Sequence, residues 1–172
     1  VGMNGSGTTM LLDALSRSPS VYAFPYESRV IPYLIKKADE VDLTNDRDFK
    51  DLFSVIASHP IIVRANAGKK VPFDDRLLRD RRSVASIIDY IFMHFADKES
   101  KSIWCEKSPQ NVQAIDEILT VFPDAMIIHL IRDGRDCAAS LHRRLKRSPE
   151  LIINRWKKIV AVGEAACHRH ED

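Results

Sequence analysis

Hydrophobic residues recur at helical spacing in three parts of the chain, and each part follows its own start signal. The first stripe, after Ser83, comprises Val84, Ile87, Ile88, Ile91, Phe92 and Phe95. The second, after Ser108 and Pro109, comprises Val112, Ile115, Ile118, Leu119 and Phe122. The third, after Ser148 and Pro149, comprises Ile152, Trp156, Ile159 and Val160. Apolar residues three and four apart face one side of a helix, and a proline after a capping serine is typical of a helix start. The sequence therefore predicts three amphipathic helices, with a shorter one from Thr8 to Arg17.

Other apolar runs lack helical spacing and predict strands. Residues 125–131 are almost continuously apolar, which is typical of a strand buried on both faces. Val21–Phe24, Ile103–Cys105 and Ile61–Val63 are shorter candidates. Strands that alternate with helices predict an α/β fold, with a parallel sheet in a three-layer domain. His129 lies inside the longest run, and we interpret it as a packed core histidine rather than a catalyst.

Composition narrows the class of protein. The chain has 172 residues, of which 45% are hydrophobic and 29% charged, as in an ordinary globular domain. Its 26 Lys and Arg exceed its 24 Asp and Glu by only two, which argues against a nucleic-acid binder. No apolar run approaches the roughly 20 residues that a membrane span needs. We therefore expect neither a nucleic-acid partner nor a membrane segment in this chain.

Cysteine and histidine usage gives no sign of a metal site. Cys105, Cys137 and Cys167 have neither the spacing of metal ligands nor a paired framework. His168 and His170 lie close to Cys167, but a solvated helix end explains this group better than a metal site, because it lacks four ligands. The pattern favours reduced thiols in a cytoplasmic protein and no bound metal.

The glycine-rich segment Gly2–Thr9 carries the clearest chemical signal. Its spacing is that of a phosphate-binding loop, with Thr8 where a lysine normally stands. Glycines let successive N–H groups point at one anion, and the helix that follows adds its positive end. Without the lysine, the loop suits a phosphate ester other than a nucleoside triphosphate. The alternative is a glycine-rich turn that only caps a helix.

Polar clusters follow three of the predicted strands. They are the segments Tyr26–Arg29, Glu106–Pro109 and Arg132–Arg135. Ligands bind at the carboxyl ends of the strands in a parallel sheet, so we expect these clusters at the same edge as the glycine loop.

These motifs together resemble the sulfotransferases that use 3′-phosphoadenosine 5′-phosphosulfate (PAPS), a family with the fold of P-loop nucleoside triphosphate hydrolases. Gly5-Ser-Gly-Thr-Thr9 is similar to the family's loop for the 5′-phosphosulfate, and the segment from Arg132 to Ser140 to its 3′-phosphate segment. Glu27-Ser-Arg-Val-Ile-Pro32 and Glu106-Lys-Ser-Pro109 look closest to the protein-tyrosine sulfotransferases and their bacterial relatives. That branch usually has an arginine at the position of Gly5.

The resemblance implies a role for each matching residue. Glu27 would be the general base for the acceptor hydroxyl, and Lys107 would stabilise charge on the leaving phosphate. Arg29 would contact the acceptor. PAPS would be held by Gly5, Ser6, Gly7, Thr8, Thr9, Arg132 and Ser140. The acceptor stays open among tyrosyl, sugar and small-molecule hydroxyls, and the oligomeric state is also open, with a homodimer among the options.

Other interpretations of the same residues stay open. Glu27 and Lys107 could be ordinary surface residues, and Arg135 could pair structurally with Asp133 instead of binding phosphate. The alternative functions are a P-loop kinase and a nucleotide-binding protein without sulfotransferase activity. Because only Val1 precedes the loop and the family's chains continue further, we expect residues 1–172 to be one sulfotransferase domain that lacks its first strand and its C-terminal part.

Overall fold

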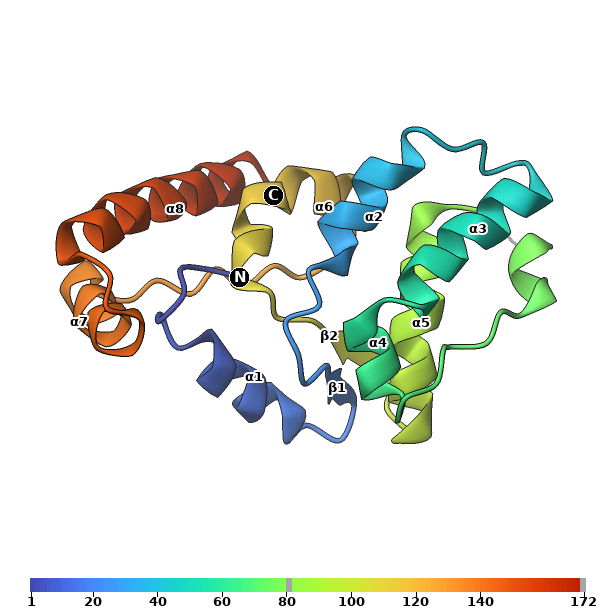
Figure 1. Ribbon diagram of the computed structural model, residues 1–172, viewed down its shortest axis with the longest axis horizontal. Helices are drawn as coiled ribbons and strands as arrows, with labels where there is room; N and C mark the ends of the chain where they lie inside the picture. Colours follow the sequence, from blue (N-terminus) through green and yellow to red (C-terminus); the bar gives the residue numbers. More distant parts are fainter. Residues whose placement is uncertain (80–81, 171–172) are drawn as a thin grey trace.

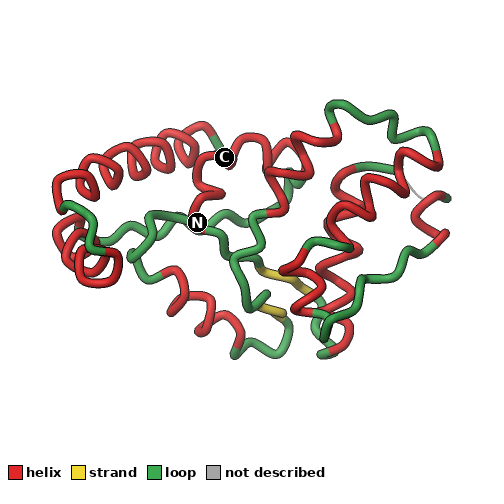
Figure 2. The backbone as a smooth tube through the Cα atoms, in the orientation of Figure 1, coloured by secondary structure: helices red, strands yellow, loops and turns green. Residues whose placement is uncertain are grey.

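Two short parallel strands lie between the first helix of the chain and the helices of its middle part (Figures 1 and 2). The structure is a computed structural model that describes residues 1–79 and 82–170. Strand β1 (Val21–Ala23) pairs in parallel with β2 (Ile103–Cys105), and Tyr22 lies opposite Trp104. The Phe24 N–H continues the pairing by donating to the Cys105 carbonyl at 2.8 Å. Both strands are confirmed, and so is the mixture of helices with a parallel sheet.

Helices make up most of the described residues. In chain order they are α1 (Thr8–Ser16), α2 (Val30–Ala38), α3 (Asp46–Ala57), α4 (Pro60–Ala65), the 3₁₀ helix η1 (Asp75–Leu78), α5 (Val84–Lys98), the 3₁₀ helix η2 (Pro109–Ala114), α6 (Ile115–Val121), α7 (Gly134–Leu145) and α8 (Pro149–Arg169). Side chains of Asn45, Ser83 and Asp133 cap α3, α5 and α7, as short polar residues commonly do. Within the described part of the chain, no helix combines the length and the apolar character that crossing a membrane requires.

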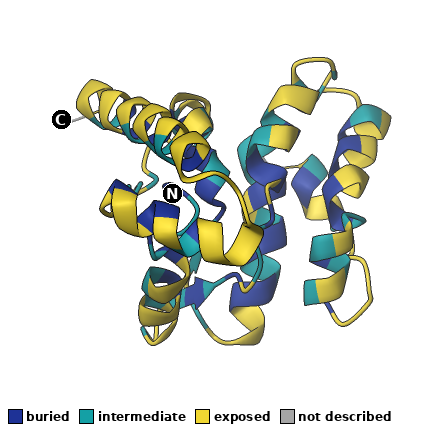
Figure 3. Ribbon diagram, turned by 60° about the vertical axis from the view of Figure 1, so that its left-hand side comes forward, coloured by how far each residue is buried: buried dark blue, intermediate teal, exposed yellow. Residues whose placement is uncertain are grey.

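The buried residues form two hydrophobic cores (Figure 3). The larger core lies among α2, α3, α5 and the strands, where Phe24, Phe49 and Phe92 are fully buried. The smaller core joins the loop residue Met3 to η2, α6, α7 and α8. Ile127 packs against both cores. The segment that contains it therefore connects the two halves of the molecule.

The longest predicted strand, residues 125–131, is wrong as a regular strand. It forms a single parallel bridge, between Gly2 and Leu130, and the Leu130 N–H donates to the Val1 carbonyl at 3.1 Å. A strand buried on both faces needs a hydrogen-bonded neighbour along its length. Among the described residues only Val1 and Gly2 fill that role, and Met126 is 88% exposed. The three-layer sheet is accordingly not seen in these residues.

Two other predictions needed adjustment. Ile61–Val63 lies inside α4, not in a strand, because Pro60 starts that helix and the His59 ring accepts a bond from the Ile61 N–H. Three apolar residues in a row have no period that could distinguish the two structures. The stripe after Pro109 begins as the 3₁₀ helix η2 before it becomes α6. Ser108 and Ser148 precede helices but make no side-chain cap bond.

Gly163 in α8 provides a test of the packing around His129. A Cβ at Gly163 would overlap the His129 imidazole, whose Nε2 atom is buried without a hydrogen-bond partner among the described residues. This contact fits the interpretation of His129 as a packing residue, and burial lowers the pKa of its ring. Gly163→Ala should lower the free energy of unfolding by about 1–3 kcal/mol, the usual cost of overpacking.

The matched control for Gly163→Ala removes the ring. In a His129→Ala background, Gly163→Ala should instead stabilise α8 by up to about 1 kcal/mol, the helix preference of alanine over glycine. Urea unfolding of the four proteins measures both effects. A loss of stability of equal size in both backgrounds would contradict the contact.

Candidate active site

The glycine loop is built around two residues with left-handed backbone angles. Gly5 has φ +90° and Gly7 has φ +102°, a region that glycine enters without steric cost. Gly7 is the N-cap of α1 and has no side chain that could cap the helix. The first N–H groups of α1 are therefore available to donate hydrogen bonds to a ligand. The Ser6 hydroxyl is buried without a hydrogen-bond partner in the described chain. Unpaired N–H groups and an orphaned hydroxyl in one loop fit an anionic ligand.

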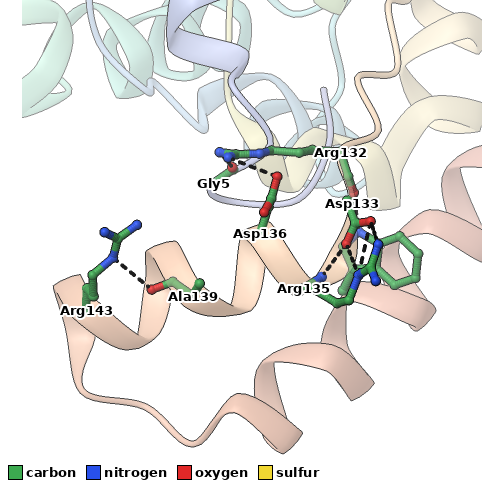
Figure 4. Close-up of polar contacts among 8 residues, drawn as sticks. Gly5, Arg132, Asp133, Arg135, Asp136, Ala139 and Arg143 are labelled. Atoms are coloured by element: carbon green, nitrogen blue, oxygen red, sulfur yellow. Dashed lines mark hydrogen bonds and ion pairs between the residues drawn. The ribbon is translucent and has the colours of Figure 1, made fainter.

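Arg132 ties the loop to α7 (Figure 4). Its guanidinium donates to the Gly5 carbonyl at 3.3 Å and pairs with Asp136 at 3.3 Å. A Cβ at Gly5 would lie 3.5 Å from Leu141 of the same helix, so the loop packs closely against α7. Ser140 precedes Leu141 on this helix and is half-buried. The structure thus brings Arg132 to the loop and places Ser140 on the helix beside it.

Arg135 is occupied by Asp133 in this structure. The guanidinium pairs with the carboxylate at 2.7 Å, and the Arg135 N–H donates to the same carboxylate at 2.8 Å (Figure 4). These hydrogen bonds hold the pKa of Asp133 well below its ordinary range. Asp133 therefore stays charged as the N-cap of α7, and the structural interpretation of Arg135 is the one that the geometry favours.

Glu27 and Lys107 form an ion pair where β1 and β2 end. Lys107 Nζ lies 2.9 Å from Glu27 Oε1, and Arg29 Nη2 lies 3.5 Å from Glu27 Oε2. The Lys107 side chain is only 12% exposed and that of Glu27 31%, so neither is an ordinary surface residue. Charges this close to the protein interior interact more strongly than in water. The three predicted residues therefore share one cluster, with a carboxylate between two cations.

The cluster lies near the glycine loop. Thr8, at the start of α1, lines the same small pocket as Glu106 and Lys107. The carboxyl ends of β1 and β2 point to this region, as expected for the ligand-binding edge of a parallel sheet.

A second, larger pocket of about 520 Å³ lies on the other side of the loop, between α7 and α8. The loop residues Met3 and Asn4 line it, together with the arginines Arg144, Arg147 and Arg155. Within residues 1–79 and 82–170, none of these guanidinium groups has a carboxylate partner. Unpaired cations around a concave surface favour an anionic ligand group. The sequence offers little sign of this pocket, because the arginines look like ordinary basic residues of a helix end.

Two other kinds of chemistry, metal binding and thiol reactivity, find little support in the described residues. Among the described residues, no cluster of three or more His, Cys, Asp or Glu side chains could hold a metal ion. Cys105, at the end of β2, is a free thiol whose pKa is raised by burial and by the neighbouring Glu106. The thiolate, the reactive form, is therefore disfavoured.

Comparison with known proteins assigns the family. The family model described as "Sulfotransferase family" matches residues 1–172, which is the whole chain. The chain belongs to the sulfotransferase family, and membership implies a transferase that moves a sulfuryl group. Searches of curated proteins and of solved structures gave no match.

Glu106 makes contacts in the structure that the sequence does not predict. The sequence pattern places it in a polar cluster at a strand end, next to Lys107, and assigns it no function. In the structure it bonds to Ser28, 78 residues earlier in the chain. The signal for this bond was weak, because nothing in the local sequence shows which distant residues a strand end meets.

Proposed function

We propose that this chain transfers a sulfuryl group from PAPS to the hydroxyl of an acceptor. The observation that carries the proposal is the Glu27–Lys107 ion pair of 2.9 Å at the ends of two parallel strands, in a chain of the sulfotransferase family. A half-buried carboxylate held by a lysine, near a loop that suits an anion, provides the base and the charge stabilisation that such a transfer requires.

The glycine loop would hold the 5′-phosphosulfate end of the donor. Its backbone N–H groups, the Ser6 hydroxyl, and Thr8 and Thr9 are the available hydrogen-bond donors. By the family resemblance, Arg132 and Ser140 would hold the 3′-phosphate, and the position of both on the α7 side of the loop supports this assignment. The arginine-lined pocket next to Met3 supports a donor with a second anionic group.

When bound, PAPS supplies an electrophilic sulfur with adenosine 3′,5′-bisphosphate as the leaving group. Glu27 takes the proton of the acceptor hydroxyl, whose oxygen forms a bond to sulfur as the bond from sulfur to the phosphate oxygen breaks. Lys107 stabilises the charge that develops on that phosphate oxygen. Arg29, 63% exposed and beside Glu27, contacts the acceptor. The proposed acceptor is a tyrosyl, sugar or small-molecule hydroxyl.

We also propose that the chain forms a three-layer domain with a parallel sheet, to which residues 125–131 belong. The bridge between Gly2 and Leu130 supports this proposal, because it is parallel, as pairing within such a sheet would be.

Ligand-induced stabilisation separates this proposal from a P-loop kinase. A ligand that binds only the native state raises its melting temperature by mass action. Adenosine 3′,5′-bisphosphate should raise the Tm, by an amount that corresponds to about 2.7 kcal/mol at a hundredfold excess over its Kd. Differential scanning fluorimetry measures the shift, with ATP–Mg²⁺ and adenosine 5′-monophosphate as controls. Stabilisation by ATP–Mg²⁺ alone would overturn the choice of donor.

A further inference from the structure

Glu106 connects the two chain segments that carry Glu27 and Lys107. It directly follows β2 and precedes Lys107, and its carboxylate accepts four hydrogen bonds. The donors to Oε1 are the Ser28 N–H (2.9 Å), the Ser28 hydroxyl (2.8 Å) and the Ser108 hydroxyl (2.6 Å), and the donor to Oε2 is the Asn111 amide (3.0 Å). Hydrogen bonds to an ionised acceptor are the stronger kind. One carboxylate thus joins the turn that precedes α2 to the segment that follows β2.

The turn that Glu106 holds is strained. Arg29, the N-cap of α2, has φ +56°, a left-handed conformation that costs free energy for any residue with a Cβ. The Arg29 N–H donates to the Ser108 hydroxyl at 3.0 Å, and Ser108 in turn donates to Glu106. Ser28 and Ser108 are both buried. The strained turn therefore persists because the network around Glu106 fixes it, as is common at functional sites.

Glu106 is unsuited to be a second base, because three donors surround one of its oxygens and a fourth occupies the other. We propose that Glu106 is a positioning residue that fixes the Glu27–Lys107 pair by clamping the turn after Glu27 to the segment that carries Lys107. This inference rests on the proposed sulfuryl transfer, and it concerns how the pair is held rather than what the pair does.

The test uses Glu106→Ala, Glu106→Gln and Ser28→Ala, each alone and in a Glu27→Gln background. Activity is expressed per site that binds adenosine 3′,5′-bisphosphate, so a fraction of misfolded protein does not count. Glu106→Ala should lower kcat on the order of 10- to 100-fold, since small displacements of catalytic groups are costly. Its Kd for the bisphosphate should stay within about twofold of the wild type, because the loop and Arg132 are not bonded to Glu106.

Glu106→Gln should restore kcat to within about threefold of the wild type, because the amide oxygen can accept the three bonds to Oε1 and the Asn111 amide can turn to offer its oxygen. Ser28→Ala removes one of the four bonds and should lower kcat by a smaller factor. It keeps the proposal testable if Glu106→Ala does not fold. The matched control is Asp89→Ala, which removes a carboxylate of α5 that accepts a 2.8 Å bond from Trp104 of β2, the strand that Glu106 follows. This control should lower Tm without lowering kcat per binding site.

The decisive comparison is the mutant cycle. A residue that acts through Glu27 has little further effect once Glu27 is gone, so the loss caused by Glu106→Ala or Ser28→Ala should shrink to below about twofold in the Glu27→Gln background. Equal losses in both backgrounds, or a kcat of Glu106→Ala within twofold of the wild type, would overturn the positioning role. If the wild type binds the bisphosphate but transfers no sulfuryl group, the proposed function fails instead, and the two failures are distinguishable.

Discussion

Replacing Glu27 by glutamine should reduce sulfuryl transfer by about 10²- to 10⁴-fold, the usual contribution of a general base. Glutamine keeps the shape of the side chain, and its amide oxygen can still accept a hydrogen bond from Lys107, now 2.9 Å from the carboxylate. It cannot take the proton of an acceptor hydroxyl. Steady-state kinetics should therefore show a lower kcat, while calorimetry shows an unchanged Kd for adenosine 3′,5′-bisphosphate.

The chain offers a matched control for this variant. Glu99 pairs with Lys101 at 3.3 Å, at the opposite end of β2 from Lys107. Glu99→Gln makes the same chemical change in an ion pair that precedes β2, whereas Lys107 of the proposed site follows it. It should leave kcat close to that of the wild type. Near-normal turnover by Glu27→Gln would remove Glu27 from the mechanism.

Removing the charge of Lys107 should lower kcat/KM by about 10²- to 10³-fold, as the loss of one preorganised charge-stabilising group does elsewhere. Lys107→Met keeps most of the length of the side chain and leaves Glu27 with Arg29 as its remaining cation, at 3.5 Å. Because the ammonium would act on charge that develops in the transition state, kcat should fall more than the affinity for the bisphosphate.

Lys101→Met is the control for Lys107→Met. The Lys101 side chain is 15% exposed against 12% for Lys107, and it also pairs with a glutamate. Both substitutions bury an uncharged side chain beside a carboxylate, so both should lower Tm. Only Lys107→Met should lower kcat/KM. A similar loss of activity in the two variants would show that the effect of Lys107 is general destabilisation.

Sequence patterns predicted the parts of the fold that depend on local signals. The helix after Ser83 is capped by that serine, and α8 begins at Pro149 as its pattern indicates. The segment 125–131 was mispredicted because its composition reports burial, whereas a strand depends on neighbours that its own residues do not specify. Ile61–Val63 was mispredicted because Pro60 and His59 favour a helix start.

In the candidate site, too, features that depend on a local motif were predictable and contacts between distant residues were not. The glycine loop and the cluster of Glu27, Arg29 and Lys107 could be proposed from motifs, because each motif is continuous in sequence. The bonds of Glu106 to Ser28 could not, since they join residues far apart in the chain. The pocket between α7 and α8 could not be predicted either, because it depends on how the loop residue Met3 packs against both helices.

The most direct test of the proposed sulfuryl transfer is the transfer of radiolabelled sulfate from PAPS to a mixed panel of tyrosyl, sugar and small-molecule hydroxyls. The wild-type chain should place label on at least one acceptor and release an equal amount of adenosine 3′,5′-bisphosphate, and Glu27→Gln should lose this transfer while it still binds the bisphosphate. If the chain binds the bisphosphate but labels no acceptor in the panel, or transfers phosphate from ATP–Mg²⁺ instead, the proposed sulfuryl transfer is wrong.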